Sequence, residues 1–352
     1  MFKKILASVV AILLFSYFVS MGLGLFLLYA VPEGLSNASR QVAELTLSAF
    51  MIVNFSIPLG VSVGLFFMMI WLLYLGAFTL AWVDKPSFPS SFRNLIARFD
   101  APPSNYLVIL PQLASVVLVA VVLLQTLQES AGVQTGGISF ESPILGFLAV
   151  SYAPLLEEFS YRITTLGLLD GLHLLWKMTR LPPTERRKSA AHVLILTMWK
   201  PERAKELLGF DTVQNAGVKR GISRFEWLLL VVTTGAFGAV HYLAGGGWEI
   251  GKISTAMLSG FAMGIVYLRY GAYAPILLHW FFNYYFGAFD LASQLNLTGA
   301  NFMVLGVELL NFSMGTLLIV VVIAASLARV WRFKHRRKES EREHVSEFPN
   351  VS

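Results

Sequence analysis

The chain has 352 residues, of which 56% are hydrophobic and only 14% are charged, and it contains no cysteine. Soluble proteins carry roughly 25% charged residues, so this composition excludes an ordinary water-soluble globular protein. The absence of cysteine excludes disulfide scaffolds, cysteine-ligated zinc or iron–sulfur sites and thiol nucleophiles in this sequence. Its chemistry must therefore use oxygen and nitrogen groups.

Eight apolar segments are long enough to be considered as membrane spans, since crossing the hydrocarbon core takes about 20 helical residues. In chain order they are 5–31, 58–83, 106–127, 143–169, 227–244, 253–270, 272–289 and 302–328. A backbone in lipid must satisfy its own hydrogen bonds, which favours helices. The sequence predicts an all-α, polytopic integral membrane protein with about eight transmembrane helices.

Two of these segments have alternative interpretations. The apolar stretch that leads into the second segment begins at Leu45, so the residues before Pro58 are a candidate interfacial helix. The basic start and the apolar residues up to Val19 resemble a signal peptide. The apolar run continues to Val31 without an A-x-A-like site, however, which favours a first membrane span.

The distribution of the 27 Lys and Arg residues predicts the orientation. With a cytoplasmic N-terminus, 24 of the 27 fall on the cytoplasmic side, Arg40 and Lys252 fall outside, and Arg162 lies within a span. Because cytoplasmic loops are enriched in Lys and Arg, both termini are predicted to be cytoplasmic. The net charge of +6 thus reflects topology, and the expected partners include membrane lipid but no nucleic acid.

Residues 1–330 are predicted to form a single helical membrane domain with a motif-bearing core at 143–289. The charged segment 177–226 is expected to be a cytoplasmic insert of two helices that is too short for its own core. The basic tail 331–352 is expected to be disordered. The predicted location is a multi-pass protein of the cell membrane in a prokaryote or of the endoplasmic reticulum in a eukaryote.

The first polar cluster within a span contains Glu157, Glu158 and Arg162. An ionisable group in the bilayer costs about 2.5–3.5 kcal/mol on insertion scales, so each needs a partner or a role. Glu158 and Arg162 are four residues apart on one helix face, which favours an ion pair. Glu157 points to another face without a cation on its own helix and is a candidate general base. The alternative is a structural polar knot that fixes helix packing.

Two further pairs repeat this four-residue spacing: Phe237 with His241, and His279 with Asn283. An imidazole and a carboxamide can both donate N–H groups toward one point, as a developing oxyanion requires. The alternative is a set of interhelical hydrogen bonds. Taken together, the clusters predict that Glu157 and His241 activate a water while His279 and Asn283 polarise a scissile carbonyl.

Two prolines precede these polar residues, Pro154 before Glu157 and Pro275 before His279. Each proline removes a helix hydrogen bond, so local widening of both helices is expected there. Widening at this depth would admit water to the polar cluster.

Three motifs in this order resemble those of the CPBP intramembrane proteases, which include the type II CAAX prenyl endopeptidases. The motifs are Glu157-Glu158-x-x-x-Arg162, Phe237-x-x-x-His241 and His279-x-x-x-Asn283. The resemblance covers 143–289 and implies a glutamate-dependent endopeptidase without metal or other cofactor, on an eight-helix fold. It implies catalytic roles for Glu157, His241, His279 and Asn283, and supporting roles for Glu158, Arg162 and Phe237.

The same resemblance implies a substrate class, since the best-known members remove the last three residues of a prenylated CAAX protein. A peptide or a lipidated, prenylated protein is therefore the expected partner. The predicted loop boundaries place His279 about seven residues from the cytoplasmic side and His241 about fifteen residues in, at about 1.5 Å per residue. The depth of the site stays open, and only the resemblance favours access from the cytoplasm.

Three other functions remain as alternatives. A zinc protease would need Glu and two His from three helices, and the sequence has no His-Glu-x-x-His helix. A proton-coupled transporter also uses buried Glu, Arg and His, although no internal repeat is detectable here. A catalytically silent membrane scaffold would keep the polar cluster for folding alone.

Overall fold

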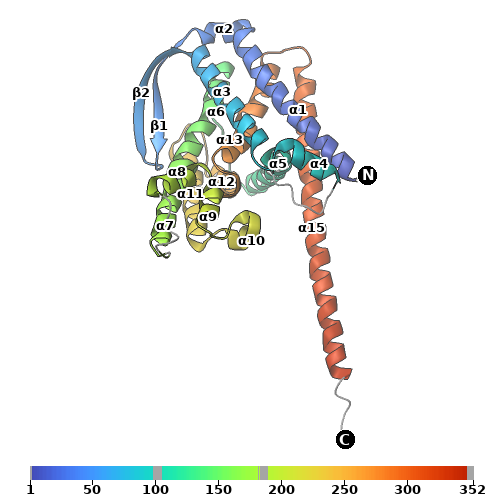
Figure 1. Ribbon diagram of the computed structural model, residues 1–352. Helices are drawn as coiled ribbons and strands as arrows, with labels where there is room; N and C mark the ends of the chain where they lie inside the picture. Colours follow the sequence, from blue (N-terminus) through green and yellow to red (C-terminus); the bar gives the residue numbers. More distant parts are fainter. Residues whose placement is uncertain (1, 98–104, 181, 183–188, 347–352) are drawn as a thin grey trace.

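The computed structural model describes residues 2–97, 105–180, 182 and 189–346 (Figure 1). It is mostly helical, as predicted, and in these residues six helices are long and apolar enough to cross a membrane. They are α1 (Phe2–Tyr29), α3 (Val63–Val83), α5 (Tyr106–Ser130), α11 (Arg224–Leu243), α12 (Gly251–Tyr270) and α15 (Ala300–Ser346). The fold is therefore that of a polytopic membrane protein.

Each of the two other predicted spans, 143–169 and 272–289, lies in an unbroken series of helices that contains a π-helical turn. The first series is α6 (Pro143–Glu158), η1 (Phe159–Gly167) and α7 (Leu168–Met178), and the second is α13 (Tyr273–Trp280), η2 (Phe281–Tyr285) and α14 (Phe286–Gln294). Both π-helical turns lie C-terminal to a proline that was expected to widen its helix, Pro154 or Pro275. Such turns are rare and occur often at functional sites.

An antiparallel hairpin replaces the expected interfacial helix before Pro58, so that prediction is wrong. Strands β1 (Gln41–Ala49) and β2 (Val53–Ser62) pair with Leu45 opposite Ile57 and Leu47 opposite Phe55. These apolar residues alternate with polar ones, and this period of two is typical of a strand. The second membrane helix consequently begins at Val63.

The tip of the hairpin lies against η1. The backbone N–H of Phe50 donates to Thr164 Oγ1 at 3.1 Å, and that of Met51 donates to Ser160 Oγ at 3.1 Å. Both tip residues have a positive φ, 53° and 66°, as a tight reversal of the chain requires. The hairpin is thus anchored beside the helix that carries the first motif.

The remaining short helices in this region are α2 (Pro32–Ala38) and α4 (Phe88–Ala97).

A cluster of buried aromatic rings holds α13 in the centre of the bundle. Trp280 is fully buried and meets Tyr17 of α1 with ring centroids 5.5 Å apart, edge to face. It also meets Phe78 of α3 at 5.0 Å and stacks on Tyr284 at 5.6 Å. Large rings in such geometries bury much area and allow few alternative packings. The aromatic core therefore fixes the helix that presents His279.

The insert forms three short helices where two were expected, namely α8 (Ala190–Trp199), α9 (Pro201–Leu207) and α10 (Val213–Gly221). Its small apolar cluster, Val193, Ala204 and Leu208, is completed by Leu174 of α7. The insert therefore shares its core with the membrane helix that precedes it. Figure 1 shows α7 to α10 together at the lower left and α2 at the top of the molecule.

Helix α15 continues through Ser346, so residues 331–346 are helical where a disordered tail was expected. This part is rich in Lys, Arg and Glu, which are good helix formers. Extending an existing helix also needs no new nucleation. The last residues of that tail, 347–352, lie outside the described part of the chain.

Close packing of α15 on α5 gives a test of the fold. A Cβ at Gly315 would lie 2.2 Å from the carbonyl oxygen of Ser115, whereas nothing lies within 4 Å of one at Gly306 on the same helix. We expect Gly315→Ala to lower the free energy of unfolding by about 1–3 kcal/mol through overpacking. Gly306→Ala is the matched control and is expected to be neutral or slightly stabilising. Equal thermal unfolding midpoints of the two variants in detergent would contradict this packing.

Candidate active site

The first motif lies where α6 passes into η1, and its Glu158 and Arg162 form the predicted ion pair. Arg162 Nη1 donates to Glu158 Oε1 at 3.2 Å, and both side chains are almost completely buried. Arg162 Nη2 donates to the carbonyl oxygen of Gly260 on α12 at 3.0 Å. The guanidinium also lies 4.4 Å from the ring centroid of Phe237 on α11. One cation thus connects three helices.

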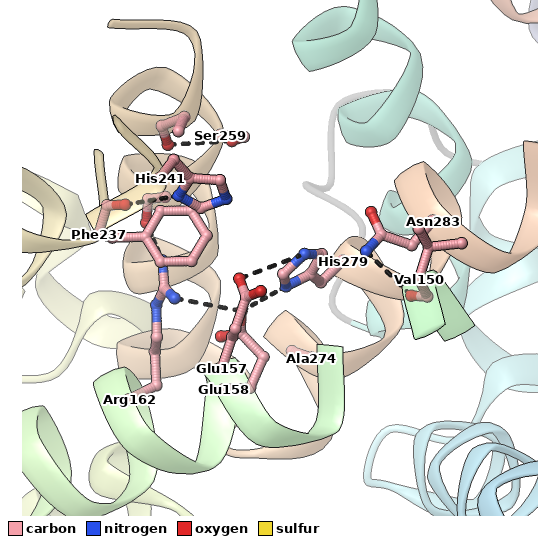
Figure 2. A network of polar contacts seen from close by, with 12 residues as sticks. Val150, Glu157, Glu158, Arg162, Phe237, His241, Ser259, Ala274, His279 and Asn283 are labelled. Atoms are coloured by element: carbon pink, nitrogen blue, oxygen red, sulfur yellow. Dashed lines mark hydrogen bonds and ion pairs between the residues drawn. The ribbon is translucent and has the colours of Figure 1, made fainter. Parts of the chain in front are cut away.

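His279 on α13 lies between the two glutamates of this motif (Figure 2). Its Nδ1 is 2.9 Å from Glu158 Oε1, a hydrogen-bond distance. Its Nε2 is 3.8 Å from Glu157 Oε2, which is too long for a hydrogen bond. Each ring nitrogen therefore faces a carboxylate. Glu158 Oε1 lies within hydrogen-bond distance of both His279 Nδ1 and Arg162 Nη1.

His241 on α11 is oriented by the backbone of its own helix. Its Nδ1 is 2.7 Å from the carbonyl oxygen of Phe237. Because a carbonyl can only accept, Nδ1 carries the hydrogen, and Nε2 of the neutral ring keeps a lone pair. The Phe237 ring packs edge to face on His241 at 4.8 Å and on His279 at 6.0 Å. Phe237 is thus a positioning residue beside both imidazoles.

Asn283 lies within η2, one turn after His279. Its Nδ2 donates to the carbonyl oxygen of Val150 on α6 at 3.0 Å, which fixes the orientation of the amide. An amide nitrogen has two hydrogens, so one N–H is left for another acceptor. The π-helical turn therefore holds a donor group that is already oriented.

A cavity of about 590 Å³ brings the predicted catalytic residues together. Its wall includes Glu157, His241, His279 and Asn283. Glu158 and Arg162 do not line the cavity but lie behind it, 0% and 1% exposed. The structure thus places all four predicted catalytic side chains on one wall, with the predicted supporting pair buried beneath them. Phe237 also lines the cavity.

Glu157 and Glu158 differ in what they touch. Glu157 retains 29% of its side-chain exposure, whereas Glu158 is fully buried between a cation and an imidazole. In both glutamates Oε2 is buried without a hydrogen-bond partner among the described residues, so this feature does not separate them. Glu157 is the one that lines the cavity, and it is therefore the carboxylate that a molecule in the cavity can reach.

The cavity wall also contains polar residues that sequence reasoning missed. They are Gln125 on α5, Lys252, Thr255 and Ser259 on α12, and Asp290 on α14. No motif marks them, and the sequence distinguished Lys252 only as one of two cations on the outer side. The Lys252 ammonium lies 3.9 Å from the ring centroid of Trp248. In the described parts of the chain, no group of three or more His, Asp or Glu side chains is arranged to hold a metal ion.

The buried ion pair can be tested by removing its cation. Arg162→Met leaves the Glu158 carboxylate buried beside His279 alone, and we expect it to lower the free energy of unfolding by about 3–5 kcal/mol. Thermal unfolding and the yield of folded protein in detergent measure this loss. The control is Arg203→Met, since Arg203 forms an exposed pair with Glu206 at 2.8 Å. It is expected to change stability by less than about 1 kcal/mol, and equal effects of the two variants would argue against the buried pair.

Comparison with known proteins relates this region to a family. The family model for type II CAAX prenyl endopeptidase Rce1-like proteins matches residues 139–285. No curated protein and no solved structure matches the chain. The matched segment contains every residue of the three motifs and nearly coincides with the motif-bearing core expected at 143–289. Over residues 139–285 the chain thus resembles the type II CAAX prenyl endopeptidase Rce1-like proteins.

Proposed function

We propose that this protein is an intramembrane endopeptidase that hydrolyses a peptide bond with a water activated by Glu157 and His241. The observation that carries the proposal is the cavity wall formed by Glu157, His241, His279 and Asn283. These residues come from three separate helical series and would have no reason to converge on one cavity if each only stabilised its own helix. The family match supports the reaction class.

Glu157 is the proposed general base. Its carboxylate is partly exposed and lines the cavity, and His241, which lines the same cavity, offers a second acceptor in Nε2. A water held by two acceptors presents its oxygen lone pair to the substrate carbonyl. As that oxygen attacks, one water proton passes to Glu157, and general base catalysis of this kind contributes about 10²–10⁴-fold in rate.

His279 and Asn283 are the proposed donors to the oxyanion that forms on the substrate carbonyl. An imidazolium at His279 would have Glu158 as acceptor for Nδ1–H and Glu157 near Nε2–H. Its positive charge, with that of Arg162, would balance the two carboxylates. Because Nε2 lies 3.8 Å from Glu157, the N–H is not committed to that carboxylate and can point to a substrate oxygen. The free N–H of Asn283 is the second donor.

The reaction ends when the tetrahedral intermediate formed by this attack collapses. The C–N bond breaks, and the proton held by Glu157 passes to the leaving amine. The products are a carboxylic acid and an amine, the acid then passes its proton to the amine to give a carboxylate and an ammonium, and Glu157 returns to its starting state. Phe237 and Glu158 act through the groups they orient and do not contact the reacting atoms.

The proposed substrate is a peptide or a lipidated protein. The cavity wall combines the polar residues with a large apolar surface, formed by Ile138, Phe140, Met263, Phe282 and Phe286. Such a surface suits an isoprenoid or acyl chain beside the scissile bond, since burying each CH₂ contributes about 0.8 kcal/mol. The family name supports a prenyl chain as one occupant.

The base can be removed with almost no change of shape. We expect Glu157→Gln to abolish cleavage of a reconstituted lipidated peptide, because the amide cannot take the proton from water. Product formation by mass spectrometry and the yield of folded protein are the measurements. The control is Glu249→Gln, an exposed glutamate that does not line the cavity, and it is expected to keep full activity. Full cleavage by Glu157→Gln would contradict the assignment of Glu157 as the base, whereas absence of cleavage by the unaltered protein would favour a silent scaffold or a proton-coupled transporter.

Metal independence gives a second test. We expect cleavage to continue after prolonged treatment with a strong chelator, because the proposed nucleophile is activated by Glu157 and His241 alone. Cleavage should be followed before and after dialysis against the chelator and after adding back zinc. Activity that disappears with the chelator and returns with zinc would favour the zinc protease instead.

A further inference from the structure

Lys252 places a positive charge on the wall of the active-site cavity. It lies in the first turn of α12, is half-buried, and lines the cavity together with Glu157, His241 and His279. Among the lining residues in the described part of the chain, it is the one Lys or Arg side chain. The proposed mechanism does not use this ammonium, so its place beside the catalytic residues points to another role.

The Lys252 ammonium lacks a counter-ion within the protein. Among the residues that the structure describes, no carboxylate lies within ion-pair distance of it. Lys200 and Lys205, in contrast, pair with Asp84 at 2.6 Å and with Glu226 at 2.8 Å. A charge withdrawn from bulk water is costly unless it is paired. An ammonium left free on a cavity wall is therefore suited to bind an anionic ligand.

The ring of Trp248 holds this ammonium in place. Lys252 Nζ lies 3.9 Å from the ring centroid, and an indole face attracts a cation without neutralising its charge. Trp248 also lines the cavity, and its backbone is joined to Gly136 by an isolated antiparallel bridge. An ammonium has three N–H donors, and contact with a ring face leaves them available for a ligand.

A stripe of polar side chains on α12 ends at Lys252. Lys252, Thr255 and Ser259 all line the cavity, and their spacing of three and four residues places them on one helix face. The hydroxyl of Thr255 donates to the carbonyl oxygen of Lys252 at 3.1 Å, and that of Ser259 donates to the carbonyl oxygen of Ala256 at 3.0 Å. Each hydroxyl oxygen can still accept, so the stripe offers acceptors to the backbone N–H groups of a bound peptide.

The other end of this stripe lies at the depth of the catalytic residues. The carbonyl oxygen of Gly260 accepts Arg162 Nη2 at 3.0 Å, and a Cβ at Gly260 would lie 2.8 Å from the Phe237 ring. That ring is 6.0 Å from the His279 ring. Lys252 precedes Gly260 on the same helix by a length of about 12 Å, at 1.5 Å per residue. An extended peptide covers this length with about three or four residues, since each adds at most about 3.3–3.6 Å.

We propose that Lys252 binds a carboxylate of the substrate and thereby determines which peptides are cleaved. This inference rests on the proposed function and adds a chemical group that the substrate carries. The carboxylate lies about three or four residues from the scissile bond, because that is the reach of an extended peptide from the depth of Gly260 to Lys252. Its source is either the α-carboxylate at the end of the peptide or an Asp or Glu side chain.

Three lipidated peptides that differ only at the C-terminus test this ligand. The first has a free C-terminal carboxylate, the second has a C-terminal carboxamide, and the third has the carboxamide together with Asp as its last residue. Their dissociation constants are measured by fluorescence anisotropy in detergent. The protein is Glu157→Gln, in which bound peptide is not expected to turn over, alone or combined with Lys252→Gln or Lys252→Arg.

We expect the peptide with the free carboxylate to bind about 10–100-fold more tightly than the carboxamide, as one charge-assisted hydrogen bond provides. Lys252→Gln should remove this difference, and Lys252→Arg should keep most of it. Tight binding of the Asp peptide would show that side-chain carboxylates are accepted, whereas weak binding of it would assign the site to the α-carboxylate.

Lys219→Gln is the matched control, because Lys219 is exposed on the insert and does not line the cavity. It is expected to leave the preference for the carboxylate unchanged. Equal affinities of all three peptides for Glu157→Gln would overturn the proposal without any change at Lys252. So would a loss of affinity on Lys252→Gln that is the same for all three peptides.

Cleavage of the same peptides separates this proposal from the proposed function. The unaltered protein should cleave the tightly bound peptides with a lower KM and a similar kcat. If it cleaves none of them while the affinities differ as expected, the proposed function fails and the carboxylate site at Lys252 stands. If Glu157→Gln abolishes cleavage while the affinities are equal, the carboxylate site fails and the proposed function stands.

Discussion

The site depends on the contacts that the buried Glu158 carboxylate makes with Arg162 and His279. An unpaired charge within a membrane protein is costly, and Glu158 is stabilised by Arg162 of η1 and by His279 of α13. Arg162 in turn needs the Gly260 carbonyl of α12 and the Phe237 ring of α11. One charge-balanced contact therefore joins the helices that carry all three motifs. This contact therefore fixes the positions of the helices that form the cavity wall.

The backbone around this contact departs from regular α-helix where the site needs it. Glu158 ends α6 directly before the π-helical turn η1, and Asn283 lies inside η2. A π-helical turn changes which side chains share a helix face, so Asn283 reaches the Val150 carbonyl while His279 reaches Glu158. The aromatic core around Trp280 then prevents α13 from turning or sliding. Rigid apolar packing around Trp280 thus holds the helix that positions the polar side chains of His279 and Asn283.

The basic insert is tied to the membrane bundle by polar contacts and by a shared apolar cluster. The carbonyl oxygen of Trp199 accepts the N–H of Ala272 directly before α13, and Lys200 Nζ lies 2.6 Å from Asp84 Oδ1. The small apolar cluster of the insert is completed by Leu174 of α7. The insert is therefore packed as part of the same fold and does not form a separate domain.

The sequence by itself determined the helical membrane fold and the ion pair of Glu158 with Arg162, because length, hydropathy and the 3.6-residue period act locally. Through the repeated four-residue spacing it also selected Phe237, His241, His279 and Asn283 of the cavity wall, but it missed others such as Lys252 and Ser259. Only the tertiary structure decided the contact of His279 with Glu158, 121 positions apart, and the docking of the hairpin tip at Phe50 on η1. Those features depend on how helices pack against one another, and no local pattern of residues encodes that packing.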